Sequence, residues 1–178
     1  PRLSSKYLPG LESLDLSQTV ADDSSLASLA SMHNLTVLKA RNTAVESFDS
    51  THFPTSLHHL DLSQTAVDGD ALAALPTMPR LTHLILNETR VDHVDAITPD
   101  RFPALRHLEL IDSQITATAD QQLASRFPDA KRLTGFGEID LVTFALTMLG
   151  RDEPATVGRI ELSDGSGISC PIKLGGSC

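Results

Sequence analysis

Aromatic residues and cysteines are both scarce in this chain. Of its 178 residues only 4% are aromatic, none is Trp, and the two cysteines, Cys170 and Cys178, fall in the last nine positions. Apolar residues still make up 40% of the chain, so a sizeable core can form. That core must be built from Leu, Val, Ile and Ala, which suits thin repeated layers better than one large globular centre.

Positive charge is also in short supply. The net charge is −9 at pH 7, whereas phosphate groups and anionic membranes both attract basic surfaces. We therefore expect neither nucleic acid nor a membrane as a partner. The apolar runs are far too short to cross a bilayer. The N-terminus, Pro1-Arg2-Leu3, has no signal-peptide pattern, and we interpret it as the start of a fragment.

A repeated leucine pattern dominates the rest of the chain. Five units fit the frame Leu-x-x-Leu-x-Leu-x-x-Thr-x-Val, and their first residues are separated by 24, 22, 24 and 24 residues. The units begin at Leu11, Leu35, Leu57, Leu81 and Leu105. A Leu-x-Leu step places both leucines on one face of a short strand, so stacked copies form a parallel sheet around a column of leucines.

The leucine column gives a specific expectation for the sheet. Strands should be centred near residues 14, 38, 60, 84 and 108. The inward leucines of these strands should be almost wholly buried, and they are Leu14, Leu16, Leu38, Leu60, Leu62, Leu84, Leu86, Leu108 and Leu110.

The segments between the strands are expected to be short helices or 3-10 turns on the opposite face. Apolar residues with i, i+3, i+6 spacing occur at Leu26, Leu29 and Met32 and again at Leu72, Leu75 and Met78. Asp22 and Asp68 precede these stripes, as N-terminal caps would. The segment Phe48–Pro54 is shorter, and we expect it to be irregular, with Phe48 and Phe53 filling the layer.

The repeat decays after residue 121. Leu133 falls in the frame of a sixth strand, but Ala130 stands at the first leucine position and Gly135 at the third. Apolar residues then recur at helical spacing, with Gly150 just past the end, which predicts a helix over 139–149 that covers the open end of the sheet. Residues 1–150 should thus form one repeat domain with its cap.

The last residues, 151–178, change character. Apolar residues alternate from Val157 to Leu174 on both sides of the turn Asp164–Gly167, which predicts a β-hairpin tail or the start of a second domain. The predicted fold class is therefore α/β: a solenoid with a short parallel sheet on its concave face, helical or 3-10 segments on its convex face, a C-terminal helical cap and a hairpin.

Residues 11–137 resemble the intracellular leucine-rich-repeat superfamily. Besides the five units, the segment Phe127–Gly135, FPDAKRLTG, is similar to the "phe-pro-x-leu-x-x-leu-asp-gly" sequence that closes the repeats of many members, with Ala130 and Thr134 as departures. The stretch 78–89, MPRLTHLILNET, and the restart Phe102–Leu105 are also similar to the repeats of the tubulin-folding cofactor E family.

The resemblance implies a protein–protein interaction scaffold that needs no cofactor and binds through its concave sheet face. An alternative is a fragment of a tubulin-folding or cytoskeletal assembly cofactor, whose family places a ubiquitin-like domain after the repeats. Secreted members usually carry disulfide-rich caps, whereas these repeats contain no Cys, so we expect a cytoplasmic protein. We also expect it to be a monomer.

The strand residues that face away from the leucines are the candidate binding residues. We expect partner contacts from Asp15, Lys39, Arg41, His59, Asp61, His83, Ile85, His107 and Glu109. Three histidines, His59, His83 and His107, fall on adjacent strands at about 4.8 Å strand spacing. They favour partner contact, although a pH-sensitive binding stripe is a second interpretation.

A metal-dependent sensor or enzyme that uses these histidines is the remaining alternative, because imidazole suits zinc, copper or nickel. Ligands must converge on one ion, however, and a flat ladder of side chains diverges, so we predict no metal. Neither a G-x-S-x-G nor an H-E-x-x-H motif occurs. We therefore predict that the chain is not an enzyme.

Overall fold

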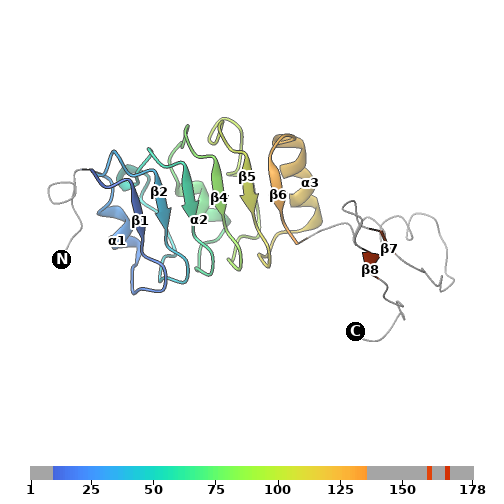
Figure 1. Cartoon of the computed structure of the whole chain (residues 1–178), viewed down its shortest axis with the longest axis horizontal. Coiled ribbons are helices and arrows are strands. Elements are labelled where there is room, and N and C mark those ends of the chain that lie inside the picture. Colours follow the sequence, from blue (N-terminus) through green and yellow to red (C-terminus); the bar gives the residue numbers. More distant parts are fainter. Residues whose placement is uncertain (1–9, 136–159, 162–166, 169–178) are drawn as a thin grey trace. The chain divides into compact units, whose positions relative to one another are not determined.

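The computed structural model describes residues 10–135 and two short pieces of the C-terminal part, 160–161 and 167–168. The chain divides into two compact units, Pro1–Gly137 and Glu138–Cys178. The first unit is an α/β structure built on a six-stranded, all-parallel sheet whose strands follow chain order (Figure 1). Its strands are β1 (Ser13–Asp15), β2 (Val37–Lys39), β3 (His59–Asp61), β4 (His83–Ile85), β5 (His107–Glu109) and β6 (Lys131–Leu133).

The leucine column is the core of this unit. The strands pair in a register that aligns Leu14, Leu38, Leu60, Leu84 and Leu108. The last four of these are completely buried, as predicted. The prediction of burial is wrong for Leu14 and Leu16, which are only partly buried. Leu14 lies in β1 and Leu16 directly follows it, and among the described residues β1 is an edge strand that pairs with β2 alone.

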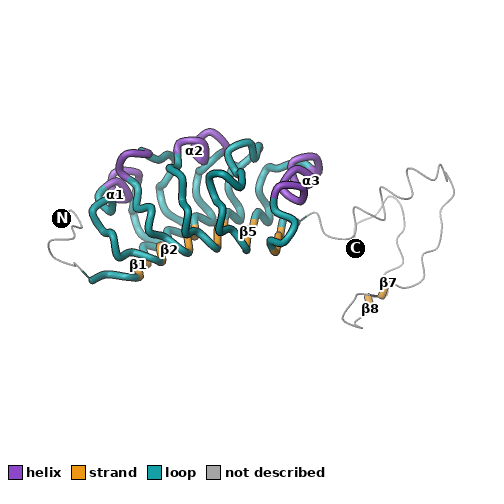
Figure 2. The backbone as a smooth tube through the Cα atoms, turned by 90° about the horizontal axis from the view of Figure 1, so that it is seen from above, coloured by secondary structure: helices purple, strands orange, loops and turns teal. Residues whose placement is uncertain are grey.

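The helices lie on one side of the sheet. Figure 2 shows α1 (Asp23–Ala27), α2 (Gly69–Ala74) and α3 (Ala117–Arg126) all on the same side of the strands. Asp22 and Asp68 are N-caps, as predicted, and each carboxylate accepts a hydrogen bond from the backbone N–H three residues later. No helix in the part of the chain that the structure describes has the length and apolar character needed to span a bilayer.

The short segment between β2 and β3 contains a single turn of 3-10 helix, η1 (Ser50–His52). The rings of Phe48 and Phe53 pack edge to face beside it, with centroids 5.3 Å apart. Phe53 is buried, and Phe48 packs against the buried core. These two rings therefore fill the layer, as the sequence predicts.

Each of the first five strands ends in the same turn. The residue at the eighth frame position has a positive φ, between 53° and 59°, at Gln18, Asn42, Gln64, Glu88 and Asp112. The next residue is always Thr or Ser, and its hydroxyl donates a hydrogen bond of 2.6–2.7 Å to the carbonyl three residues earlier. This turn redirects the chain from the sheet to the helical side in every repeat.

Two arginines connect their return segments to the previous ones. Arg101 and Arg126 stand directly before two of the three Phe-Pro pairs, Phe102-Pro103 and Phe127-Pro128. The Arg101 guanidinium donates to the carbonyls of Leu72, Ala73, Leu75 and Ala96. That of Arg126 donates to the carbonyls of Val94, at 2.6 Å, and Ile97, at 3.2 Å. Most of these carbonyls belong to the previous repeat, so the two guanidinium groups form hydrogen bonds across the repeat boundary.

The sixth strand differs from the prediction in its register. Arg132, and not Leu133, stands opposite Leu108, while Leu133 pairs with Glu109. Ala130 occupies the first frame position, since its N–H donates to the Phe127 carbonyl as the N–H of Leu105 donates to the Phe102 carbonyl one repeat earlier. β6 begins one residue after Ala130, whereas β5 begins two residues after Leu105. A shift of one residue exchanges the two faces of a strand.

The second unit is described only in part. Strands β7 (Ile160–Glu161) and β8 (Gly167–Ile168) pair antiparallel, with Ile160 opposite Ile168. Ile160 and Ile168 were predicted for the two strands of the hairpin and are paired here, whereas Gly167, predicted for the turn, lies in β8 opposite Glu161. The predicted capping helix over 139–149 and the predicted boundary at residue 150 lie outside the described residues.

Candidate functional site

The candidate site is the face of the sheet that points away from the leucine column and the helices, which we call the outer sheet face. It contains the third, fifth and seventh frame positions of each repeat, and all nine predicted contact residues belong to it. Parallel pairing brings eight of them into two rows, one with His59, His83 and His107 and one with Asp15, Lys39, Asp61, Ile85 and Glu109. Arg41 lies at the seventh position of its repeat, where β2 has ended.

The histidine row is the most regular feature of this face. The ring centroids of His59 and His83 are 5.6 Å apart, and those of His83 and His107 are 5.3 Å apart, with interplanar angles near 30°. The Nδ1 atom of His83 lies 2.9 Å from the Thr82 hydroxyl. The rings thus form a continuous stack over β3, β4 and β5.

Glu109 fixes one end of the row. Its carboxylate lies 2.6 Å from Nε2 of His107 and accepts a 2.7 Å hydrogen bond from the side-chain amide of Asn87. The hydrogen bond to His107 is the main reason that the pKa of Glu109 lies below its ordinary value. Asn87 is held in turn, because its side-chain oxygen accepts from the N–H of Ile111 at 2.8 Å.

The carboxylates of the two aspartates on the outer sheet face form hydrogen bonds with the turns that follow their own strands. The carboxylates of Asp15 and Asp61 each accept a 2.9 Å hydrogen bond from the N–H of the serine two residues later. The hydrogen bonds from Ser17 are the leading cause of the lowered pKa of Asp15. Lys39 lies between the two aspartates in the register and is exposed.

Arg41 belongs to a polar chain that sequence reasoning missed. Its Nε donates to the side-chain oxygen of Gln64 at 3.1 Å, and the Gln64 amide donates to both carboxylate oxygens of Glu88 at 2.9 Å. Gln64 and Glu88 are two of the positive-φ residues. The signal was present in the sequence, since the eighth frame position is polar in all five repeats.

Apolar side chains lie beside the histidines on the same face. Ile85 is partly buried, and Ile111, which was not among the predicted contact residues, is 37% exposed. Leu133 joins the fifth-position row because of the register of β6. The outer sheet face thus combines stacked rings and aliphatic side chains with the charged groups of the fifth-position row.

The histidine row does not have the geometry of a metal site. Zinc–nitrogen bonds are about 2.0–2.1 Å long, so ligand nitrogens must converge, whereas these rings are stacked side by side. In residues 10–135 and the two described strands of the C-terminal unit, no group of three or more His, Cys, Asp or Glu residues could hold a metal ion.

The pKa of His59 is the most direct test of the stacked arrangement. Burial lowers this pKa below the ordinary 6.5, and the neighbouring His83 lowers it further. We expect His83→Gln to raise it toward 6.5, as measured by NMR titration of the ring protons. Because the folded-state pKa is lowered, the stability that His59 contributes is present above its unfolded pKa and is lost as the pH falls toward the folded-state value. An unchanged His59 pKa in the variant would show that the two rings do not interact.

Comparisons with known proteins assign no family to the chain, since no protein-family model and no curated protein matches it. A function can therefore be inferred only from the geometry and chemistry of the described residues.

Proposed function

We propose that the chain is a leucine-rich-repeat solenoid of the intracellular type that binds a partner protein through its outer sheet face. In this proposal it is a cytoplasmic monomer with no catalytic activity, and the helix expected over 139–149 covers the end of its sheet. The common turn of the five repeats and the sequential parallel strands support the solenoid. The observation that carries the function is the stack of His59, His83 and His107 on the sheet face opposite the helices.

A protein partner suits this surface better than other classes of partner. Protein interfaces combine apolar and aromatic side chains with polar and charged ones, and here the histidine rings and Ile85 adjoin Lys39, Asp61 and Glu109. The side chains are already ordered by one another, so little conformational entropy is lost when they are covered. The net charge of −9 opposes nucleic acid.

Replacing all three histidines by Ala should separate binding from folding. We expect partner affinity to fall by at least about tenfold, because binding energy concentrates in a few central residues. The melting temperature should fall only modestly, since the three rings lie outside the leucine core, and most of the change should come from His107, which is hydrogen-bonded to Glu109. The measurement is quantitative capture of cellular proteins by the wild-type and variant chains, with affinities for the recovered partner determined on purified components.

A matched control keeps the result specific. Thr118, Gln121 and Gln122 are exposed on α3, on the helical side, and their triple replacement by Ala should leave capture unchanged. A histidine variant that retains the same partners with the same affinities would move the binding site away from the outer sheet face.

A further inference from the structure

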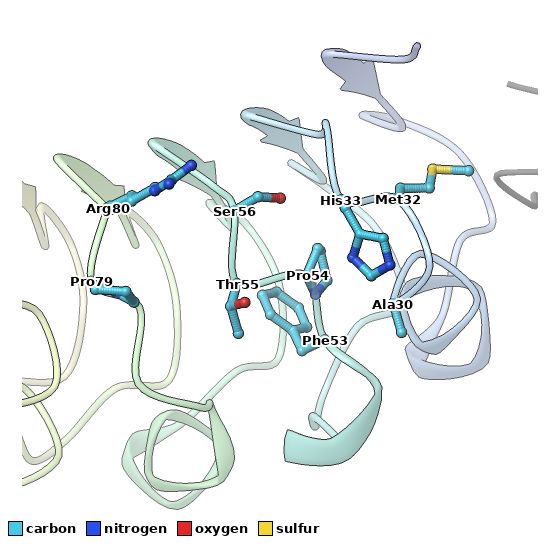
Figure 3. Close-up of a pocket in the computed structure, with 9 residues that line it drawn as sticks. All are labelled: Ala30, Met32, His33, Phe53, Pro54, Thr55, Ser56, Pro79 and Arg80. Atoms are coloured by element: carbon cyan, nitrogen blue, oxygen red, sulfur yellow. The ribbon is translucent and has the colours of Figure 1, made fainter. Parts of the chain in front are cut away.

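A second candidate site lies beside the start of the strands. A pocket of about 380 Å³ is lined by nine residues from three consecutive repeats, namely Ala30, Met32, His33, Phe53, Pro54, Thr55, Ser56, Pro79 and Arg80. Figure 3 shows the segment 53–56 running between His33 on one side and Pro79 and Arg80 on the other. The volume is within the range of about 300–1,000 Å³ found for ligand sites.

The pocket arises from the one short repeat. The second unit spans 22 residues where its neighbours span 24. Three residues before the first frame leucine it has Pro54, where the adjoining repeats have Met32 and Met78. Those methionines are buried, and each carbonyl accepts a hydrogen bond from the leucine three residues later. The smaller, rigid Pro54 leaves a depression between the two neighbouring repeats.

The charge of the lining is opposite to that of the chain. The protein has 23 acidic and 14 basic residues, yet none of the nine lining residues is acidic, while Arg80 and His33 are both present. Arg80 and His33 are exposed, and neither forms a hydrogen bond or an ion pair with the described residues. In contrast, Arg101 and Arg126 are committed to backbone carbonyls.

The two hydroxyl groups of the lining also differ in whether they are already hydrogen-bonded. Ser56 donates its hydroxyl to the Leu35 carbonyl at 2.7 Å. The Thr55 hydroxyl has no hydrogen bond to any described residue, and Thr55 is exposed. The pocket therefore offers a guanidinium, an imidazole and a hydroxyl above an apolar floor of Phe53 and Pro54. Donors of this kind recognise a carboxylate.

We propose that this pocket binds a carboxylate side chain of an acidic peptide segment, with a neighbouring apolar side chain of the same segment against Phe53 and Pro54. Of the nine lining residues only Met32, Phe53 and Pro54 are buried. Ligand sites for free small molecules usually enclose most of the ligand, whereas an open pocket suits one side chain of a longer peptide that passes over it. The site is separate from the outer sheet face and does not depend on its function.

A peptide titration tests this assignment. The probe is the blocked tripeptide acetyl-Leu-Glu-Leu-amide, added to the full ¹⁵N-labelled chain and followed by amide chemical shifts. We expect saturable shifts at residues 30–33, 53–56 and 79–80 with a dissociation constant on the order of 1 mM. The Leu-Gln-Leu analogue should bind about tenfold more weakly, because it lacks the charge. Free glutarate, which has the carboxylates without the peptide, should also bind about tenfold more weakly.

Variants locate the binding groups. Arg80→Gln should weaken binding of the Leu-Glu-Leu probe about tenfold, and Arg90→Gln, an exposed arginine outside the lining, should have no effect. The triple histidine variant should bind the probe normally, so a failure of the outer sheet face remains distinguishable from a failure of the pocket. Pocket shifts that are absent, or equal for the Glu and Gln probes, or insensitive to Arg80→Gln would overturn the proposal. Glutarate binding as tight as that of the peptide would overturn the peptide as occupant.

Discussion

Replacing Leu84 by Ala is expected to lower the free energy of unfolding by about 2–5 kcal/mol. Leu84 is completely buried and stands in the middle of the aligned column, with Leu60 on one side and Leu108 on the other. Truncation removes its buried methyl groups and leaves a cavity that neighbours held in the sheet register cannot fill. Urea unfolding followed by circular dichroism measures the loss.

Leu14→Ala is the matched control. The two leucines occupy the same frame position, but Leu14 is only partly buried in the edge strand. Its truncation should cost clearly less, about 1 kcal/mol, because part of its surface is already in water and no closed cavity forms. Equal losses at Leu14 and Leu84 would contradict a core that depends on neighbours on both sides.

The contrast between these leucines also shows what the sequence could predict. The regular spacing of the leucines predicts the centre of each strand and the register in which the strands pair. Stacked repeats align their leucines whatever the residues between them are. The same period cannot tell which repeat lies at the end of the stack. Leu14 and Leu38 have the same local sequence pattern, and only the position of their strands in the sheet separates a half-buried side chain from a buried one.

The sixth strand could not be predicted from the period for a different reason. The sequence frame puts Leu133 inward, and apolar character alone supports that choice. The structure instead places Arg132 opposite Leu108, with its guanidinium donating to the carbonyls of Phe127 and Ala130 at 3.0 and 3.4 Å. Its Nε is buried and has no hydrogen-bond partner among the described residues. Where the leucine pattern ends, backbone carbonyls rather than apolar contacts hold the inward side chain.

The candidate site was predicted in position but not in detail. Alternation within the strands identified His59, His83 and His107 as neighbours, and their stacking confirms that placement. The contacts of Arg41 with Gln64 and of Gln64 with Glu88 depend on positive φ angles in the turns. No glycine marks those turns, and Gln and Glu are unusual there, so the recurrent polar residue at the eighth frame position was their only indication in the sequence.

Arg101 has a role that no periodicity predicts, and its replacement by Met is expected to lower the free energy of unfolding by about 2 kcal/mol. Its guanidinium donates to Leu72 and Ala73 in the last turn of α2, to Leu75 just past it, and to Ala96. The last carbonyls of a helix have no partner within the helix. Arg101 is partly buried, and this burial lowers its pKa. Met keeps the length and apolar contacts of the side chain but removes the guanidinium donors of those carbonyls.

Two further variants distinguish hydrogen bonding from charge. Arg101→Lys keeps the charge but presents one ammonium in place of a planar fork, so it should recover only part of the lost stability. Arg90→Met removes an exposed arginine and should change the free energy of unfolding by less than about 0.5 kcal/mol. Urea unfolding of the three variants under identical salt conditions gives the ranking. If Arg101→Lys were as stable as the wild type, simple charge near the end of α2 would explain the effect, and the cross-repeat hydrogen bonds would contribute nothing measurable.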